Sequence, residues 1–175
     1  KLDFVSKIKK DNYRHGSINS KLSNSNEILI NLSKFYTLKK LLKKLKPKNL
    51  LDFGCGKGSF LNYLRYKNEI NDLFGIEKNY LSRTYAINHY KLKVKENIHD
   101  FYNNEFSLIT MWHSLEHLKL SEINSFFKFI KNKKNVGIFI SVPNQEALLF
   151  KIFGKNNTYH DEDNHFFQFS MKSLD

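Results

Sequence analysis

Three closely spaced glycines form the part of the sequence best suited to ligand chemistry. The segment LLDFGCGKGSF, at residues 50–60, carries Gly54, Gly56 and Gly58 directly after an apolar run. Glycines between a strand and a helix let the backbone turn tightly and approach a ligand closely. A carboxylate, Glu77, falls at the tip of the next predicted strand, where it can accept both hydroxyls of a ribose. The segment therefore predicts a site for a nucleoside cofactor.

The spacing of the glycines separates the cofactor classes. A dinucleotide-binding loop has the pattern G-x-G-x-x-G, whereas this chain has G-x-G-x-G with Asp52 two residues before the first glycine. A phosphate-binding loop is excluded because no G-K-[ST] follows at the required spacing. The arrangement resembles motif I of the class I S-adenosylmethionine (SAM) methyltransferases. A nicotinamide cofactor and a plain tight turn are the alternatives.

The resemblance implies a cofactor and a set of binding residues. By analogy with that family, Asp52 and the loop at 54–58 hold the methionine part of SAM, and Glu77 holds the ribose. The expected cofactor-binding residues are Asp52, Phe53, Gly54, Cys55, Gly56, Gly58, Glu77, Lys78, Ile98, His99, Met111 and Trp112.

Acidic residues stand where ligands of open α/β sheets bind, at the carboxyl ends of the predicted strands. SAM carries a sulfonium cation and an ammonium group, so a protein of net charge +12 should concentrate acids around it. The acids at predicted strand ends or in the following loops are Asp52, Glu77, Asp100, Glu116 and the Asp161-Glu162-Asp163 cluster. Their placement favours a cationic ligand.

A second segment, FSLITMWHSLEHL at residues 106–118, supplies candidate proton acceptors. Its Leu-Glu-His follows the fourth predicted strand, a Val-Pro-Asn follows the fifth, and a later histidine precedes Phe-Phe-Gln-Phe-Ser. These elements resemble the branch of class I methyltransferases that includes ubiquinone-type O-methyltransferases and sugar methyltransferases. A hydroxyl acceptor must lose its proton, and a positioned histidine contributes about 10²–10⁴ in rate. The catalytic candidates are His113, His117 and His165, with helix capping or loop pinning as the alternative role.

The same segment also matches the H-x-x-E-H pattern of a zinc protease class, with His113 and His117 four residues apart. That pattern needs a long helix and a downstream carboxylate ligand, whereas here it follows directly on an apolar run. His160, Asp161 and His165 are the other candidate metal ligands. We expect no catalytic metal.

The elements that must position these residues alternate along the chain. Apolar runs predict strands over residues 50–53, 73–77, 94–98, 106–112 and 136–142. Periodicity predicts helices over 27–46 (stopped by Pro47), 59–67, 79–90, 121–131 (with Ser121 as N-cap) and 145–153. Such alternation implies an α/β fold with a mostly parallel sheet and helices on both faces. The resemblance specifies it as the Rossmann-like sheet of class I methyltransferases.

Composition narrows the class further. The 175 residues suit one domain, and the single cysteine, Cys55, excludes a disulfide scaffold. No apolar run approaches the ~18 residues of a membrane span, and no signal peptide is visible. We therefore expect a cytoplasmic protein. Because the positive charge comes from 26 Lys and only 3 Arg, a solvated lysine surface is favoured over a phosphate-binding track.

The domain organisation follows from the same pattern. Residues 1–46 form an N-terminal lead-in and helix, a candidate lid that carries Tyr13 and His15, and residues 47–175 form the SAM-binding domain. The family sheet usually has seven strands and a final antiparallel hairpin, whereas five strands are predicted here. We expect the natural protein to continue past Asp175, or a partner to cover the sheet edge.

The resemblance implies methyl transfer from SAM to an oxygen, nitrogen or carbon centre of a small molecule, such as a sugar or a quinone-like metabolite. An RNA methyltransferase and a non-catalytic binding module are the alternatives. Methylation of a base amino group loses support, because Met111-Trp112-His113-Ser114 stands after the fourth strand where that chemistry has its own motif. Methylation of cytosine C5 loses support, because it needs a cysteine nucleophile beside the fourth strand and the single cysteine, Cys55, lies inside the cofactor loop. A homodimer is compatible with the sequence.

Overall fold

The computed structural model describes residues 21–144, 146 and 166–170. The predicted helix at 145–153 and the residues Tyr13, His15, His160, His165 and 161–163 therefore lie wholly or almost wholly outside the described residues. Contacts divide the chain after Lys44 into two units, which are described separately.

Helix α2 (Lys21–Leu45) is the described element of the first unit. It ends just before Pro47, as predicted, and Lys46 takes a positive φ of 46°. The buried positions of the helix recur at three- and four-residue spacing, and they are Asn31, Phe35, Leu38 and Leu42. Ile28, which the apolar periodicity includes, is instead 60% exposed.

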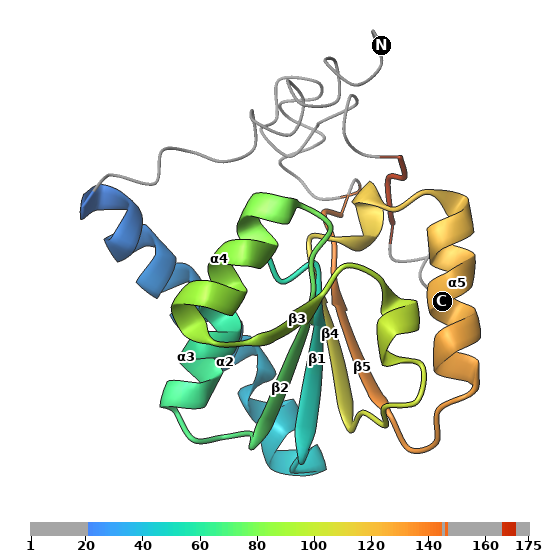
Figure 1. The fold of residues 1–175 in the computed structure, drawn as a ribbon, viewed down its shortest axis with the longest axis horizontal. Coiled ribbons are helices and arrows are strands. Elements are labelled where there is room, and N and C mark those ends of the chain that lie inside the picture. The colour runs from blue at the N-terminus through green and yellow to red at the C-terminus, as the bar shows by residue number, and fades with distance from the viewer. Residues whose placement is uncertain (1–20, 145, 147–165, 171–175) are drawn as a thin grey trace, which may run out of the picture. The chain divides into compact units, whose positions relative to one another are not determined.

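The second unit is built on a five-stranded parallel sheet with the order β3-β2-β1-β4-β5 (Figure 1). The strands are β1 (Asn49–Phe53), β2 (Asp72–Ile76), β3 (Lys93–Lys95), β4 (Leu108–Trp112) and β5 (Gly137–Ser141). The central strands β1 and β4 are buried along nearly all their length, which explains their uninterrupted apolar sequences. The strand order reverses between β1 and β4, and open α/β sheets bind ligands at such a switch point.

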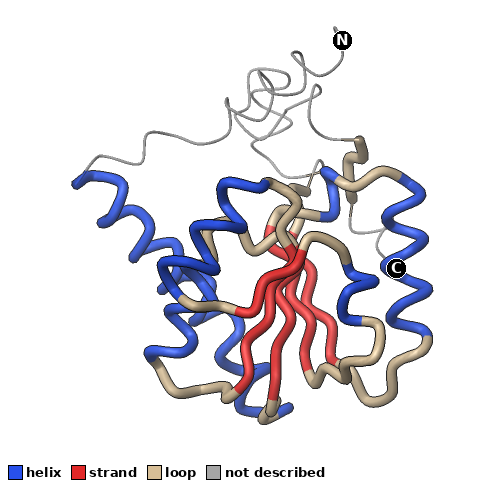
Figure 2. Tube along the Cα trace, viewed as in Figure 1, coloured by secondary structure: helices blue, strands red, loops and turns tan. Residues whose placement is uncertain are grey.

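Helices cover both faces of this sheet. They are α3 (Ser59–Tyr66), α4 (Tyr80–Tyr90) and α5 (Leu120–Lys131), together with the short 3₁₀ helices η1 (Ile98–Phe101) and η2 (Leu115–His117). Figure 2 shows the strands as one layer, with α3 and α4 on one side and α5 and η1 on the other. The predicted Rossmann-like α/β fold with a mostly parallel sheet is confirmed.

Several predicted element boundaries are wrong: α2 begins at Lys21 instead of residue 27, β4 begins at Leu108 instead of residue 106, and two others have a local cause. The strand expected over 94–98 ends at Lys95, and Ile98 begins η1, because the Asp100 carboxylate accepts a hydrogen bond from the Asn97 amide and starts a turn. Ser121 is not the N-cap of α5, which begins at Leu120. Glu122 reaches back instead, and its Oε2 accepts the Lys119 amide at 2.8 Å.

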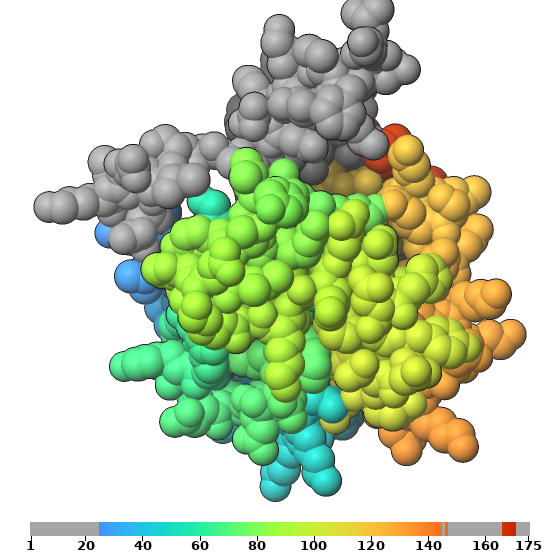
Figure 3. Space-filling model, in the orientation of Figure 1, coloured from blue at the N-terminus to red at the C-terminus, as the bar shows by residue number. Residues whose placement is uncertain are grey.

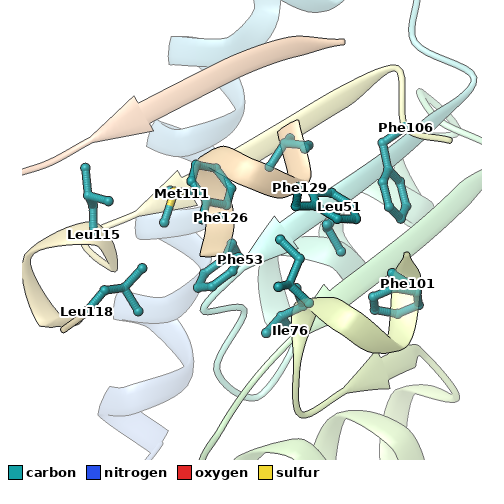
Figure 4. Close-up of a cluster of buried hydrophobic side chains, with 12 residues drawn as sticks. Leu51, Phe53, Ile76, Phe101, Phe106, Met111, Leu115, Leu118, Phe126 and Phe129 are labelled. Carbon is teal, nitrogen blue, oxygen red and sulfur yellow. The ribbon is translucent and has the colours of Figure 1, made fainter. Parts of the chain in front are cut away.

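A buried apolar cluster lies between the sheet and α5 (Figure 4). Phe126 of α5 meets Phe53 of β1 edge to face, with ring centroids 5.4 Å apart. Met111 of β4, an expected cofactor contact, belongs to this cluster and is fully buried. The cluster fixes α5 against the strand ends, and this places α5 beside the candidate site.

Candidate cofactor site

The three glycines of the β1–α3 loop all adopt left-handed backbone conformations, with φ of 78°, 57° and 78°. At Gly54 a Cβ would lie 2.2 Å from the Ser114 Oγ, so the absence of a side chain lets this loop pack against the segment after β4. At Gly58 a Cβ would lie 2.5 Å from the Leu92 Cδ1. At Gly56 no atom of the described residues lies within 4 Å of the Cβ position. The backbone at Gly56 therefore borders open space that a ligand can enter.

Glu77, directly after β2, is tied to this loop by its carboxylate. Its Oε2 accepts the Gly56 amide at 2.8 Å, and its Oε1 accepts the Asn79 amide at 2.7 Å. A carboxylate offers about four acceptor positions, so each oxygen retains capacity for one more donor. The two backbone amides fix the carboxylate in place, and the remaining capacity suits a pair of neighbouring hydroxyls.

Asp52 lies beneath the loop and is buried, with 2% of its surface exposed. It pairs in register with Thr110 of β4, whose Oγ1 donates a hydrogen bond to Asp52 Oδ1 at 2.7 Å. A buried carboxylate requires such donors, because its desolvation is costly otherwise. This contact joins the two strands at the switch point.

A cavity opens between the ends of β1, β2 and β3 and helix α5, and it is lined by the two chain neighbours of Glu77 but not by Glu77 itself or by the glycine loop. Its lining consists of Phe53, Ile76, Lys78, Glu96, Asn97, Ile98, His99, Glu122 and Ser125. Four of these, Phe53, Lys78, Ile98 and His99, belong to the expected cofactor set. Glu96 and Asn97 were missed because the strand was predicted to run to residue 98, so the rule that ligands bind at strand ends pointed to Ile98 and His99, whereas β3 ends at Lys95. Glu122 and Ser125 come from α5 and carry no local signal.

The cavity combines an apolar interior with a charged rim. Phe53, Ile76 and Ile98 are buried apolar side chains. Lys78 forms an ion pair with Glu122. Burial, together with the nearby Lys119, lowers the pKa of Lys78 and outweighs the opposing effect of two carboxylates, Glu77 and Glu96.

Two further residues of the expected cofactor set pack away from this cavity. The Cys55 Sγ lies against β2, where a Cβ on Gly75 would come within 2.5 Å of it. The Trp112 ring packs against Phe60 and Phe139, with centroids 5.6 Å and 4.7 Å away. The backbone amide of Cys55 donates to the Ile76 carbonyl at 3.0 Å, so the residue helps to hold the loop on β2.

Of the candidate proton acceptors, His113 has the clearest setting. It follows β4 with a positive φ of 50°, and half of its side chain is exposed. Its Nδ1 lies 3.5 Å from Glu116 Oε1, and the Glu116 side chain is 2% exposed. Neither Glu116 oxygen accepts a hydrogen bond within the described part of the chain. His117 ends η2 and is partly buried, and His165 lies outside the described residues.

The structure around His113 does not have the long helix that the H-x-x-E-H pattern of zinc proteases needs. Helix η2 contains only Leu115–His117, so His113 and His117 do not share a helix face. Among the residues that the structure describes, no three side chains of the metal-ligating types converge. Over the same residues, no helix is both long and apolar enough to cross a membrane.

The glycine loop after β1 and the carboxylate after β2, on a parallel sheet with this strand order, define a nucleoside-binding α/β protein of the Rossmann-like class. Residues 32–175 match the family described as a methyltransferase domain. The chain belongs to this family, and it is therefore classed as a transferase enzyme. No curated protein matches the sequence significantly.

Solved structures share the fold. The methyltransferase domain of bacterial CtHen1 aligns with a TM-score of 0.63 and 19% identity, over 82% of this chain and 79% of that domain. A SAM-dependent methyltransferase from Archaeoglobus fulgidus aligns with a TM-score of 0.61 and 18% identity, over 85% of this chain and 65% of that protein. The plantazolicin methyltransferase BpumL, in complex with a monoazolic desmethylPZN analog and SAH, aligns with a TM-score of 0.60 and 18% identity, over 79% of this chain and 58% of that protein. At these identities the likeness shows the fold, that of the class I methyltransferases.

Proposed function

We propose that this chain binds SAM and transfers its methyl group to a small-molecule acceptor. The observation that carries the proposal is the bond between the Gly56 amide and the Glu77 carboxylate, which joins the glycine loop to an acid beside open space. A nucleoside fits these residues, because the carboxylate retains acceptor capacity and the adjoining cavity has an apolar interior. The structures of BpumL with SAH support the same cofactor class for this fold.

We assign the cofactor-holding roles as follows. Glu77 holds the ribose hydroxyls, the loop at 54–58 approaches the methionine part, and Asp52 supplies negative charge beneath it. The Phe53 ring and the Ile98 side chain offer apolar contact in the cavity. When bound, SAM would supply an activated methyl group: the acceptor's nucleophile would bond to the methyl carbon while the carbon–sulfur bond breaks and S-adenosylhomocysteine leaves. The chain's own contribution is alignment, which is worth about 7–11 kcal/mol in well-oriented reactions.

We further propose that His113 accepts the proton of a hydroxyl acceptor. The buried Glu116 carboxylate beside its Nδ1 favours an oriented imidazole at the carboxyl end of β4. His117 and His165 remain candidates for contacts to the acceptor. With the Leu-Glu-His and Val-Pro-Asn segments, these residues favour the ubiquinone- and sugar-methyltransferase branch, which is expected in the cytoplasm.

Calorimetric titration with SAM and SAH tests the cofactor. We expect binding, and we expect Glu77→Ala to weaken it at least about tenfold through the loss of charge-assisted hydrogen bonds. Glu69→Ala, which removes an exposed carboxylate at the opposite end of β2, is the matched control and should bind as the parent does. Absence of binding at millimolar ligand would contradict the proposal.

The acceptor is identified by incubating the protein with SAM and metabolite pools and detecting products that gain one methyl group in mass. RNA is the second candidate acceptor, because the chain carries a net charge of +12. Salt-dependent RNA binding in a gel shift, combined with methyl incorporation into RNA only, would favour that alternative.

A further inference from the structure

Arg83 joins the ends of two strands beside the candidate cofactor site. It lies on α4, and its side chain is 15% exposed. Its Nη1 donates to the carbonyl oxygens of Glu77 at 2.7 Å and Lys78 at 2.9 Å. Its Nη2 donates to Glu96 Oε2 at 2.8 Å. One guanidinium thus holds the backbone after β2 and a side chain after β3.

The identity of this residue is informative because the chain otherwise uses lysine as its cation, with 26 Lys and 3 Arg. A planar guanidinium carries donors in a fixed fork, whereas an ammonium is a single point of charge. The three acceptors lie after β2 and after β3, and they are divided between two separate nitrogens of the fork, Nη1 and Nη2. Arginine therefore occupies a position that lysine cannot fill with the same three contacts.

The carbonyls that Arg83 holds belong to the residue that carries the ribose-binding carboxylate and to its neighbour. The Glu77 amide donates to the Lys95 carbonyl at 3.0 Å, so the peptide groups on both sides of Glu77 have fixed partners. Glu96, the third acceptor, lines the cavity. Figure 3 shows α4 and the segment after β3 on the same face of the molecule.

We propose that Arg83 is a positioning residue for SAM binding: it holds the Glu77 backbone so that the Glu77 carboxylate meets the Gly56 amide and the ribose hydroxyls. This inference rests on the proposed function. It assigns Arg83 no contact with the cofactor, because its three acceptors all belong to the protein.

Titration of SAH by calorimetry tests the inference. We expect Arg83→Met to weaken binding about tenfold, the equivalent of one lost hydrogen bond to a charged group, and Arg83→Lys to restore part of the loss. Arg65→Met is the matched control, because Arg65 bonds to Asn62 and to the Tyr90 carbonyl and makes no contact at the site. Urea unfolding of each variant separates weaker binding from unfolding.

A double-mutant cycle with Glu77→Gln measures whether the losses of SAH affinity at Arg83 and Glu77 are coupled. A purely structural role of Arg83 would give no such coupling. If Arg83 acts through Glu77, Arg83→Met should cost little once the carboxylate is gone, which gives a coupling of at least about threefold. Independent, additive losses would overturn the proposal while leaving SAM binding intact.

Amide hydrogen exchange on the unliganded protein tests the positioning role of Arg83 without requiring that the protein binds SAM. We expect the Gly56 and Asn79 amides, which donate to the Glu77 carboxylate, to exchange several-fold faster in Arg83→Met and to be unchanged in Arg65→Met. Unchanged exchange in Arg83→Met would overturn the positioning role even if the parent fails to bind SAM. Failure of the parent to bind SAM would overturn the proposed function and the role of Arg83 in SAM binding, and the exchange data would still decide whether Arg83 holds the Glu77 carboxylate in place.

Discussion

Gly54 and Gly56 offer a matched pair of substitutions that separates backbone strain from steric exclusion. Both have positive φ, so alanine costs about 1–2 kcal/mol of left-handed strain at each. Only at Gly54 would the new Cβ collide, 2.2 Å from the Ser114 Oγ and 2.8 Å from the Ser114 Cβ. Overpacking adds about 1–3 kcal/mol, so we expect Gly54→Ala to lower the free energy of unfolding by about 2–5 kcal/mol and Gly56→Ala by about 1–2 kcal/mol.

Urea unfolding measures this difference. With a denaturant slope of about 2 kcal/mol/M, the midpoint should fall by about 1–2.5 M for Gly54→Ala and by about 0.5–1 M for Gly56→Ala. Ser114→Gly removes both colliding atoms, so combining it with Gly54→Ala should recover about 1–3 kcal/mol in a double-mutant cycle. Equal losses at the two glycines, or no recovery with Ser114→Gly, would refute the steric reasoning.

Cofactor affinity should rank the same two variants in the opposite order. Gly56→Ala places a methyl group in the open space beside the Glu77 carboxylate, so SAM binding should weaken at least about tenfold in a protein that remains folded. Calorimetry on both variants checks this, and unimpaired binding by Gly56→Ala would place the ligand elsewhere.

Substitutions at three further residues test the surroundings of the site. Thr110→Val should lower the free energy of unfolding by about 1.5–3 kcal/mol, because buried Asp52 loses a donor, whereas Thr110→Ser should retain most of it; urea unfolding decides. Glu116→Met should leave stability unchanged or raised while reducing methyl transfer, because this buried carboxylate accepts no hydrogen bond from the described residues and its burial is costly; a large loss of stability would reveal a structural role. The pKa of Lys78 in the folded protein is lowered from 10.5, so the unfolded state binds this proton more tightly. The contribution of Lys78 to the free energy of unfolding therefore rises as the pH rises towards 10.5. Lys78→Met should remove this rise, as measured by urea unfolding at a series of pH values from about 8 to about 11.

The order of helices and strands could be predicted because it depends on residue types that are close together in the sequence. Pro47 and the glycines punctuate the chain, and the buried strands are continuous apolar runs. Two of the boundary predictions failed because a side chain makes a local hydrogen bond that periodicity does not encode. Asp100 turns the chain after β3, and Glu122 replaces Ser121 in capping α5.

The sequence by itself determined the class of site: the glycine spacing and an acid at the next strand tip already indicated a nucleoside cofactor. Parallel strands bring their carboxyl ends to one edge, so these residues had to meet. Only the tertiary structure decided which side chains complete the site. Glu122 and Ser125 reach the cavity because Phe126 anchors α5 on β1, and Arg83 bridges two strand ends because α4 packs across β3. Such contacts depend on packing between segments distant in sequence, which no local pattern records.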